Sequence, residues 1–139
     1  NALEELRDLA RGIHPPILTD RGLEAAVTAL SGKSPVPVSL AVDVADRPPP
    51  PVETAAYFVV AEALANAIKH ADAGRIDIRI RRTNGSLVAE VEDDGRGGAN
   101  SAGNGLAGLE QRVRALDGTL SVESPAGGPT TVKVELPCA

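Results

Sequence analysis

Two runs of alternating apolar and polar residues, 75–83 and 86–93, are separated by Asn84 and Gly85. Alternation with a period of two is typical of a strand that buries one face, and Asn-Gly is a strong signal for a two-residue hairpin turn. The chain is therefore expected to contain an antiparallel sheet with one apolar face. An apolar sheet face needs a second layer to cover it.

Helical periodicity elsewhere in the chain supplies that layer. Helices are expected at residues 1–13, over about a dozen residues from Leu23, at 52–71 and at 106–116. Further strands are expected at 36–44, 119–124 and 130–136. The prolines at 48–51 are interpreted as a stiff loop inside one domain. This order of elements favours a layered α/β fold with helices over one face of the sheet.

Charge and cysteine content exclude several classes of protein. The formal net charge of −5 argues against binding nucleic acid through a basic surface. A single cysteine, Cys138, excludes an intramolecular disulfide framework and a cysteine-rich zinc site. No apolar run reaches the roughly 18–20 residues of a membrane span, so we expect neither a membrane span nor a signal peptide in this sequence. Because the chain begins at Asn1 without a methionine, we expect it to be a piece of a longer protein.

The second strand of the hairpin carries a carboxylate on its apolar face. Asp93 continues the apolar positions of 86–93, whereas Asp94 falls on the opposite face. Burying a carboxylate is costly unless fixed donors hydrogen-bond to it, and Gly95 and Gly97 follow, where glycine lets the backbone approach a ligand closely. A buried acceptor of this kind is suited to an exocyclic amino group. The alternative is a strand-end aspartate that caps a turn.

The long helix 52–71 carries a polar stripe. Glu62, Asn66, Lys69 and His70 lie at i, i+4, i+7 and i+8 and therefore share one side of the helix. A solvated helix face is the usual meaning of such a stripe. However, a carboxylate together with an amide oxygen also suits a hard cation such as Mg²⁺.

Two features in the C-terminal half of the chain add further candidate residues for the same site. The alternation in the last strand turns Thr130 inward, where its hydroxyl would support Asp93 or a water between them. Gly103 and Gly105 precede the helix at 106–116, and free amides at a helix N-terminus favour phosphate.

In chain order, these segments are Glu62-Ala-Leu-Ala-Asn66-Ala-Ile-Lys69-His70-Ala, Asp93-Asp-Gly95-Arg-Gly97, Gly103-Asn-Gly105-Leu106 and Gly127-Gly-Pro129-Thr130-Thr-Val132…Leu136-Pro137. They resemble the N box, the two glycine boxes and the terminal GTxVxxxLP pattern of the histidine-kinase ATP-binding domain, with Pro129 where glycine is usual. Arg11–Leu18, followed by Gly22-Leu23, resembles the segment after the dimerisation helices in sensor kinases related to nitrate/nitrite and desaturase-control sensors.

The resemblance implies a Bergerat-type two-layer α/β sandwich, a mixed sheet covered on one face by helices, that binds ATP with Mg²⁺ and phosphorylates a histidine. By the same resemblance, Asp93 accepts the adenine amino group, with Thr130 and Gly97 nearby. Asn66 holds Mg²⁺, and Glu62 is the catalytic residue that polarises the attacking histidine or a water.

The resemblance assigns the remaining motif residues to nucleotide binding as well. Lys69 and His70 are expected near the phosphates, and Gly103 and Gly105 are expected to hinge a lid and open the next helix toward them. Gly95 and Leu106 belong to the same nucleotide-binding set, as members of the two glycine boxes.

The phosphoacceptor histidine is expected to be missing. His14 precedes two prolines and His70 lies in the N box, so neither resembles the acceptor. We expect residues 1–19 to be the end of a dimerisation helix and a hinge, and 20–139 to be the ATP-binding catalytic domain, which binds nucleotide without efficiently phosphorylating itself. The expected partners are the dimerisation and phosphoacceptor domain of the same kinase and a response regulator, not nucleic acid. The domain is expected in the cytoplasm as a monomer, and the full-length protein as a homodimer, with or without a membrane anchor.

Two other functions remain as alternatives. An anti-sigma-factor-type serine kinase shares the same boxes, although residues 11–18 look like a kinase hinge. A degenerate nucleotide-binding or partner-docking module without turnover is favoured by Pro129 and by the near absence of aromatic residues, but not by the intact Glu62, Asn66 and Asp93. Gyrase-, chaperone- and mismatch-repair-type ATPases fit less well, because they usually have larger domains and longer lids.

Overall fold

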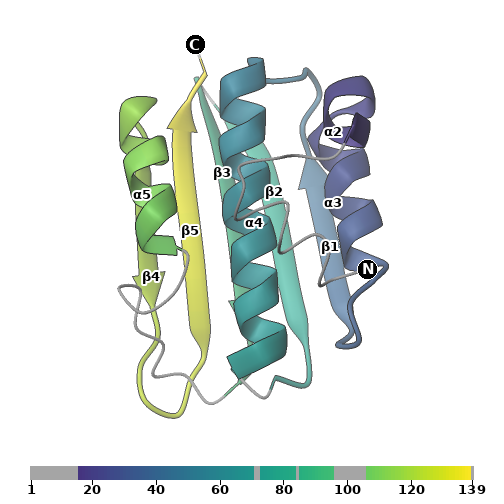
Figure 1. Cartoon of the computed structure of the whole chain (residues 1–139), viewed down its shortest axis with the longest axis vertical. Helices are drawn as coiled ribbons and strands as arrows, with labels where there is room; N and C mark the ends of the chain where they lie inside the picture. Colours follow the sequence, from purple (N-terminus) through teal and green to yellow (C-terminus); the bar gives the residue numbers. More distant parts are fainter. Residues whose placement is uncertain (1–15, 71–72, 84, 96–105, 139) are drawn as a thin grey trace.

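The structure, a computed structural model, describes residues 16–70, 73–83, 85–95 and 106–138 (Figure 1). Its elements are α2 (Pro16–Arg21), α3 (Leu23–Ser31), β1 (Val38–Asp43), α4 (Pro50–His70), β2 (Ile76–Thr83), β3 (Ser86–Asp93), α5 (Leu106–Ala115), β4 (Thr119–Glu123) and β5 (Thr130–Pro137). The expected strands and the three expected helices from Leu23 onward are confirmed to within a few residues. The helix expected at 1–13 lies outside the described residues.

The strands form one five-stranded mixed sheet in the order β1-β2-β3-β5-β4. β1 and β2 pair in parallel, and the other neighbouring strands pair antiparallel. Figure 1 shows the helices on one face of this sheet, with α4 between α3 and α5. The expected two-layer α/β sandwich is therefore confirmed.

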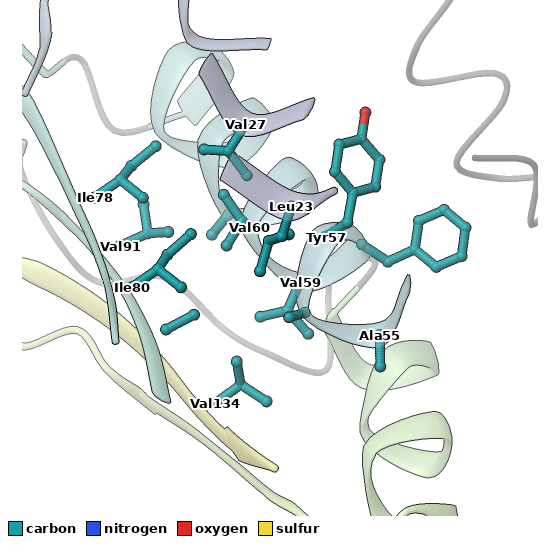
Figure 2. Close-up of a cluster of buried hydrophobic side chains, with 14 of the residues drawn as sticks. Leu23, Val27, Ala55, Tyr57, Val59, Val60, Ile78, Ile80, Val91 and Val134 are labelled. Atoms are coloured by element: carbon teal, nitrogen blue, oxygen red, sulfur yellow. The ribbon is translucent and has the colours of Figure 1, made fainter. Parts of the chain in front are cut away.

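The core lies between α4 and the sheet. Figure 2 shows Ile78, Ile80, Val91 and Val134 of the sheet on the side where α4 contributes Val59 and Val60. Each side chain of this kind contributes roughly 1.5–3 kcal/mol when it is fully buried. Since the strands alternate, the opposite face of the sheet carries charged residues and faces solvent. A site for a ligand on the helical side must therefore lie at an end of the strands, where the apolar rows stop.

The loop expected at 48–51 is only half confirmed, since Pro48 and Pro49 lie between β1 and α4 but the next two prolines do not. Pro50 and Pro51 are the first residues of α4 rather than part of a loop, and Pro16 is the first residue of the short helix α2, which was not expected at all. Proline is tolerated in the first turn of a helix because the amides there have no intrahelical acceptor, and its fixed φ suits the helix. The same residue type therefore marks a helix start here instead of a connector.

An ion pair between the buried Glu53 and the half-exposed Arg47, which the sequence did not predict, connects the start of α4 to the α2–α3 turn. Glu53 is only 3% exposed, and its Oε1 lies 2.6 Å from Arg47 Nη2. Its Oε2 accepts a hydrogen bond from the Leu23 amide at 3.2 Å. Arg47 Nη2 also donates to the carbonyls of Leu18 and Thr19, at 3.1 and 3.2 Å. One carboxylate and one guanidinium thus join two regions of the chain, 18–23 and 47–53, that lie 28 to 30 residues apart at these contacts.

We expect Glu53→Gln to destabilise the fold. Glutamine keeps an oxygen for the Leu23 amide but loses the charge that pairs with Arg47. Because half of the Arg47 side chain remains in water, we place the loss at about 1–2 kcal/mol, which is a fall in melting temperature of roughly 3–8 °C. Glu24→Gln, an exposed position on α3, is the matched control. Equal melting temperatures of the two variants would show that the ion pair does not hold the helices.

Candidate functional site

Asp93 and Thr130 lie next to each other at one end of the sheet. Asp93 ends β3, Thr130 begins β5, and the antiparallel register places them directly opposite each other. Both are buried, with 4% and 8% of their surface exposed. Asp94 is exposed. The prediction that Asp93 and Thr130 point inward and Asp94 points outward is therefore confirmed.

The Asp93 carboxylate is a buried acceptor. Its Oδ1 accepts a hydrogen bond from the amide of Gly95 at 2.9 Å. Burial raises the pKa of Asp93, and the negative charges of Asp94 and Glu92 act in the same direction, while the Gly95 hydrogen bond opposes them. A ligand that donates a hydrogen bond to this carboxylate would compensate the cost of keeping it ionised.

Asp94 has a different role from its neighbour. Its Oδ1 accepts hydrogen bonds from the amides of Gly74 and Arg75, at 2.8 and 2.9 Å. These bonds, first that of Arg75 and then that of Gly74, lower the pKa of Asp94. Asp94 therefore fixes the chain between α4 and β2 to the end of β3. Of the two adjacent aspartates, Asp93 is therefore a buried hydrogen-bond acceptor, and Asp94 is an exposed residue that stabilises the fold.

The predicted polar stripe lies in the C-terminal half of α4. Glu62 and Asn66 are half-buried and Lys69 is exposed. His70 ends the helix, but its side chain lies outside what the structure describes. The Asn66 Nδ2 atom is buried and has no hydrogen-bond partner among the described residues. A buried amide left in this state fits a position where a ligand or metal shell supplies the missing contacts.

The fold brings the stripe and the carboxylate to the same end of the molecule. The C-terminal end of α4 leads to Ile76, the first residue of β2, and Ile76 pairs with Asp93. In Figure 1 the end of α4, the end of β3 and the start of β5 all lie at the lower end of the sandwich. Residues from three elements can thus face one bound molecule.

The glycine boxes are only partly described. Gly95 is buried beside Asp93, and Leu106 is the buried first residue of α5. The predicted ligand-binding positions Gly97, Gly103 and Gly105 lie outside the described residues.

The donor set of the described residues fits a Mg²⁺ ion that is shared with a ligand. Within the ranges that the structure describes, no three His, Cys, Asp or Glu side chains are arranged to hold a metal by themselves. Mg²⁺ is commonly bound by one or two protein oxygens together with phosphate oxygens and waters. The unpaired atom of Asn66 is the Nδ2 donor, which can donate to a phosphate oxygen or to a water of the metal shell. The Mg²⁺ ligand itself would be the amide oxygen of Asn66. In the described part of the chain, no helix is both long and apolar enough to cross a membrane.

One residue near the site was not singled out from the sequence. The Ser124 hydroxyl lies 2.6 Å from the Thr130 hydroxyl. The signal that could have found it is parity, since Ser124 follows Leu120 and Val122 at alternate positions.

Known proteins share this sequence pattern and this fold. The sequence model described as histidine kinase-, DNA gyrase B- and HSP90-like ATPase matches residues 52–139. The oxygen sensor histidine kinase NreB of Staphylococcus carnosus is 29% identical over an aligned stretch of 145 residues, gaps included, that spans 97% of this chain and 42% of NreB. The chain thus spans less than half the length of that relative.

Solved structures agree with these sequence matches. The histidine kinase domain of the blue-light activated kinase of Erythrobacter litoralis EL346 superposes with a TM-score of 0.69 at 27% identity, covering 84% of this chain and 59% of that one. The ATP binding domain of PrrB from Mycobacterium tuberculosis superposes with a TM-score of 0.58 at 25% identity, covering 88% and 94%. The two-layer sandwich of this chain agrees with these matches. The chain belongs to the histidine kinase-, DNA gyrase B- and HSP90-like ATPase family, as an ATP-binding catalytic domain of the sensor histidine kinase type.

Proposed function

We propose that this domain binds Mg·ATP at the end of the sandwich formed by α4, β3 and β5, and donates the γ-phosphoryl group to a histidine of a dimerisation domain. The observation that carries this proposal is the buried Asp93 carboxylate beside Thr130, at the edge of an otherwise apolar core. A carboxylate there accepts a hydrogen bond from the amino group of adenine. Guanine presents a carbonyl oxygen at the same position, which the carboxylate repels.

The polar stripe on α4 is assigned to the phosphate end of the nucleotide. Asn66 would hold Mg²⁺ through its amide oxygen, with Lys69 and His70 near the phosphates. When bound, Mg²⁺ neutralises charge on the phosphate oxygens. Phosphoryl transfer depends on this neutralisation and on positioning more than on covalent chemistry by the protein. The exposed position of Lys69 at the end of α4 suits a contact with a solvent-facing phosphate.

Glu62 is assigned to the acceptor side of the reaction. A ring nitrogen of the acceptor histidine attacks the γ-phosphorus, the bond to the β–γ bridging oxygen breaks, and ADP leaves with the electron pair. The Glu62 carboxylate accepts a hydrogen bond from the other ring N–H and so polarises the imidazole. Glu62 lies one turn before Asn66 on α4, which would keep the acceptor close to the metal-bound phosphate.

The partners follow from the same assignment. The acceptor domain of the same kinase supplies the histidine, a response regulator receives the phosphoryl group, and the full-length kinase is a homodimer. Because the domain needs ATP, which is supplied in the cytoplasm, we assign the domain to the cytoplasm. Residues 1–19 would connect it to the dimerisation helices.

Calorimetric titration of ATP and GTP into this chain, each with and without Mg²⁺, tests the proposal. We expect ATP to bind more tightly than GTP by roughly tenfold or more, because the carboxylate attracts one base edge and repels the other. We also expect Mg²⁺ to strengthen ATP binding. Equal affinities for ATP and GTP would contradict the assignment of Asp93, and phosphorylation of an added dimerisation domain would then test the transfer step separately.

A further inference from the structure

Three polar side chains lie side by side at one end of the sheet, on β3, on β5 and directly after β4. Asp93 of β3 faces Thr130 of β5. Glu123 of β4 faces Thr131, so the next antiparallel step places Ser124 opposite Thr130. The side-chain contact agrees with this register, since Ser124 Oγ lies 2.6 Å from Thr130 Oγ1. The row thus runs from a buried carboxylate to a buried hydroxyl and then to a half-buried hydroxyl.

The turn between β4 and β5 holds Ser124 in this position. The amide of Gly128 donates to the carbonyl of Pro125 at 2.9 Å. Gly127 and Gly128 have backbone φ angles of 92° and 79°, which residues other than glycine rarely adopt. The turn therefore reverses the chain directly after Ser124 and returns it at Thr130.

A pair of hydroxyls can be ordered in two ways. Either oxygen of the Ser124–Thr130 pair can be the donor. When Ser124 donates, the single Thr130 proton remains available for another acceptor. When Thr130 donates, its oxygen can only accept further hydrogen bonds. The direction of the Ser124–Thr130 hydrogen bond therefore decides whether the Thr130 proton is available to another acceptor next to Asp93.

We propose that Ser124 is a positioning residue for base selection, which donates to Thr130 Oγ1 and so directs the Thr130 proton toward the bound base or a water on it. This inference rests on the proposed function of the site. The edge of adenine presents an amino donor beside a ring-nitrogen acceptor, and Asp93 with a donating Thr130 complements that order. The edge of guanine presents a carbonyl acceptor beside an N–H donor, which is the reverse order. Ser124 thus adds to the discrimination without contacting the base.

The test compares ATP and GTP affinities of Ser124→Ala with those of the parent chain. Without Ser124 the Thr130 hydroxyl can rotate and accept, so we expect ATP to bind roughly threefold to tenfold more weakly, the loss of about one neutral hydrogen bond. GTP affinity should stay the same or rise, and the ATP/GTP ratio should fall. A purely structural role would lower the melting temperature and weaken both nucleotides alike.

Three further variants complete the comparison. Ser124→Thr keeps the hydroxyl and should restore the ratio. Ser121→Ala, at an exposed position of the preceding strand β4, should leave the ratio unchanged. If the alanine variant fails to fold, Ser124→Cys keeps the volume with a much weaker donor, and its ratio decides instead.

The outcomes separate this inference from the proposed function. A parent chain that prefers ATP, together with a Ser124 variant that keeps the full ratio, overturns the role of Ser124 and leaves the Asp93 assignment intact. A parent chain that binds ATP and GTP equally overturns the Asp93 assignment itself, and the role of Ser124 with it. A reduced ratio in Ser124→Ala that Ser124→Thr restores supports both.

Discussion

Asp93→Asn is expected to weaken ATP binding by roughly 10- to 100-fold and to abolish the preference for ATP over GTP. A hydrogen bond from a ligand to a charged acceptor contributes more than one to a neutral acceptor. In the variant, the amide must also keep an oxygen toward the Gly95 amide, which the Asp93 Oδ1 atom now binds at 2.9 Å. Its NH₂ group then faces the adenine amino group, and two donors oppose each other. Calorimetric titration with ATP and GTP measures both effects.

The same substitution is expected to raise the melting temperature of the nucleotide-free domain at neutral pH. Because burial raises the pKa of Asp93, the folded state binds this proton more tightly than the unfolded state does. Its contribution to stability is therefore largest at low pH, falls as the pH rises from the ordinary aspartate value through the folded pKa, and is constant above that. Asparagine removes this penalty. The two proteins should converge in stability in acid and separate toward neutral pH, as followed by circular dichroism melts.

Asp94→Asn is the matched control and has the opposite sign. Hydrogen bonds from the Arg75 and Gly74 amides lower the pKa of Asp94, so its stabilising contribution is present above the ordinary aspartate value and is lost as the pH falls through the folded pKa. The variant should melt at a lower temperature at neutral pH and keep the preference for ATP. If Asp93→Asn instead melted lower at neutral pH and kept that preference, Asp93 would be a turn cap and not a ligand acceptor.

Asn66→Ala is expected to remove most of the gain in ATP affinity that Mg²⁺ provides, roughly tenfold or more, while leaving affinity without Mg²⁺ nearly unchanged. The melting temperature of the free domain should not fall. The Asn66 Nδ2 atom is buried without a partner among the described residues, and alanine removes that unpaired group and favours the helix.

Two comparisons make the Asn66 experiment decisive. The titration without Mg²⁺ is an internal control for general damage to the site. Asn66→Asp keeps an oxygen ligand and should retain a dependence on Mg²⁺. An unchanged Mg²⁺-dependent gain in Asn66→Ala would assign the metal contact to another residue.

The local patterns of the sequence were sufficient to predict which way most side chains point. The Asn84–Gly85 signal and the alternation around it predicted the β2–β3 hairpin and the inward orientation of Asp93, and the structure confirms both. Helical spacing predicted the stripe on α4. These predictions succeeded because a period of two or 3.6 residues fixes the face of each side chain within one element.

Such patterns could not predict which residues become neighbours on adjacent strands of the sheet. The sequence alone left open that β5 lies between β3 and β4, although this order brings Thr130 to Asp93 and Ser124 to Thr130. It also gave no sign of the contact between Arg47 and Glu53, or of the helix starts at Pro16 and Pro50. The periodicity of one strand carries no information about which other strand it pairs with, since that choice minimises the free energy of the whole packed core. The sequence by itself therefore determined the faces of the elements and the family motifs, whereas the tertiary structure decided which of these residues meet.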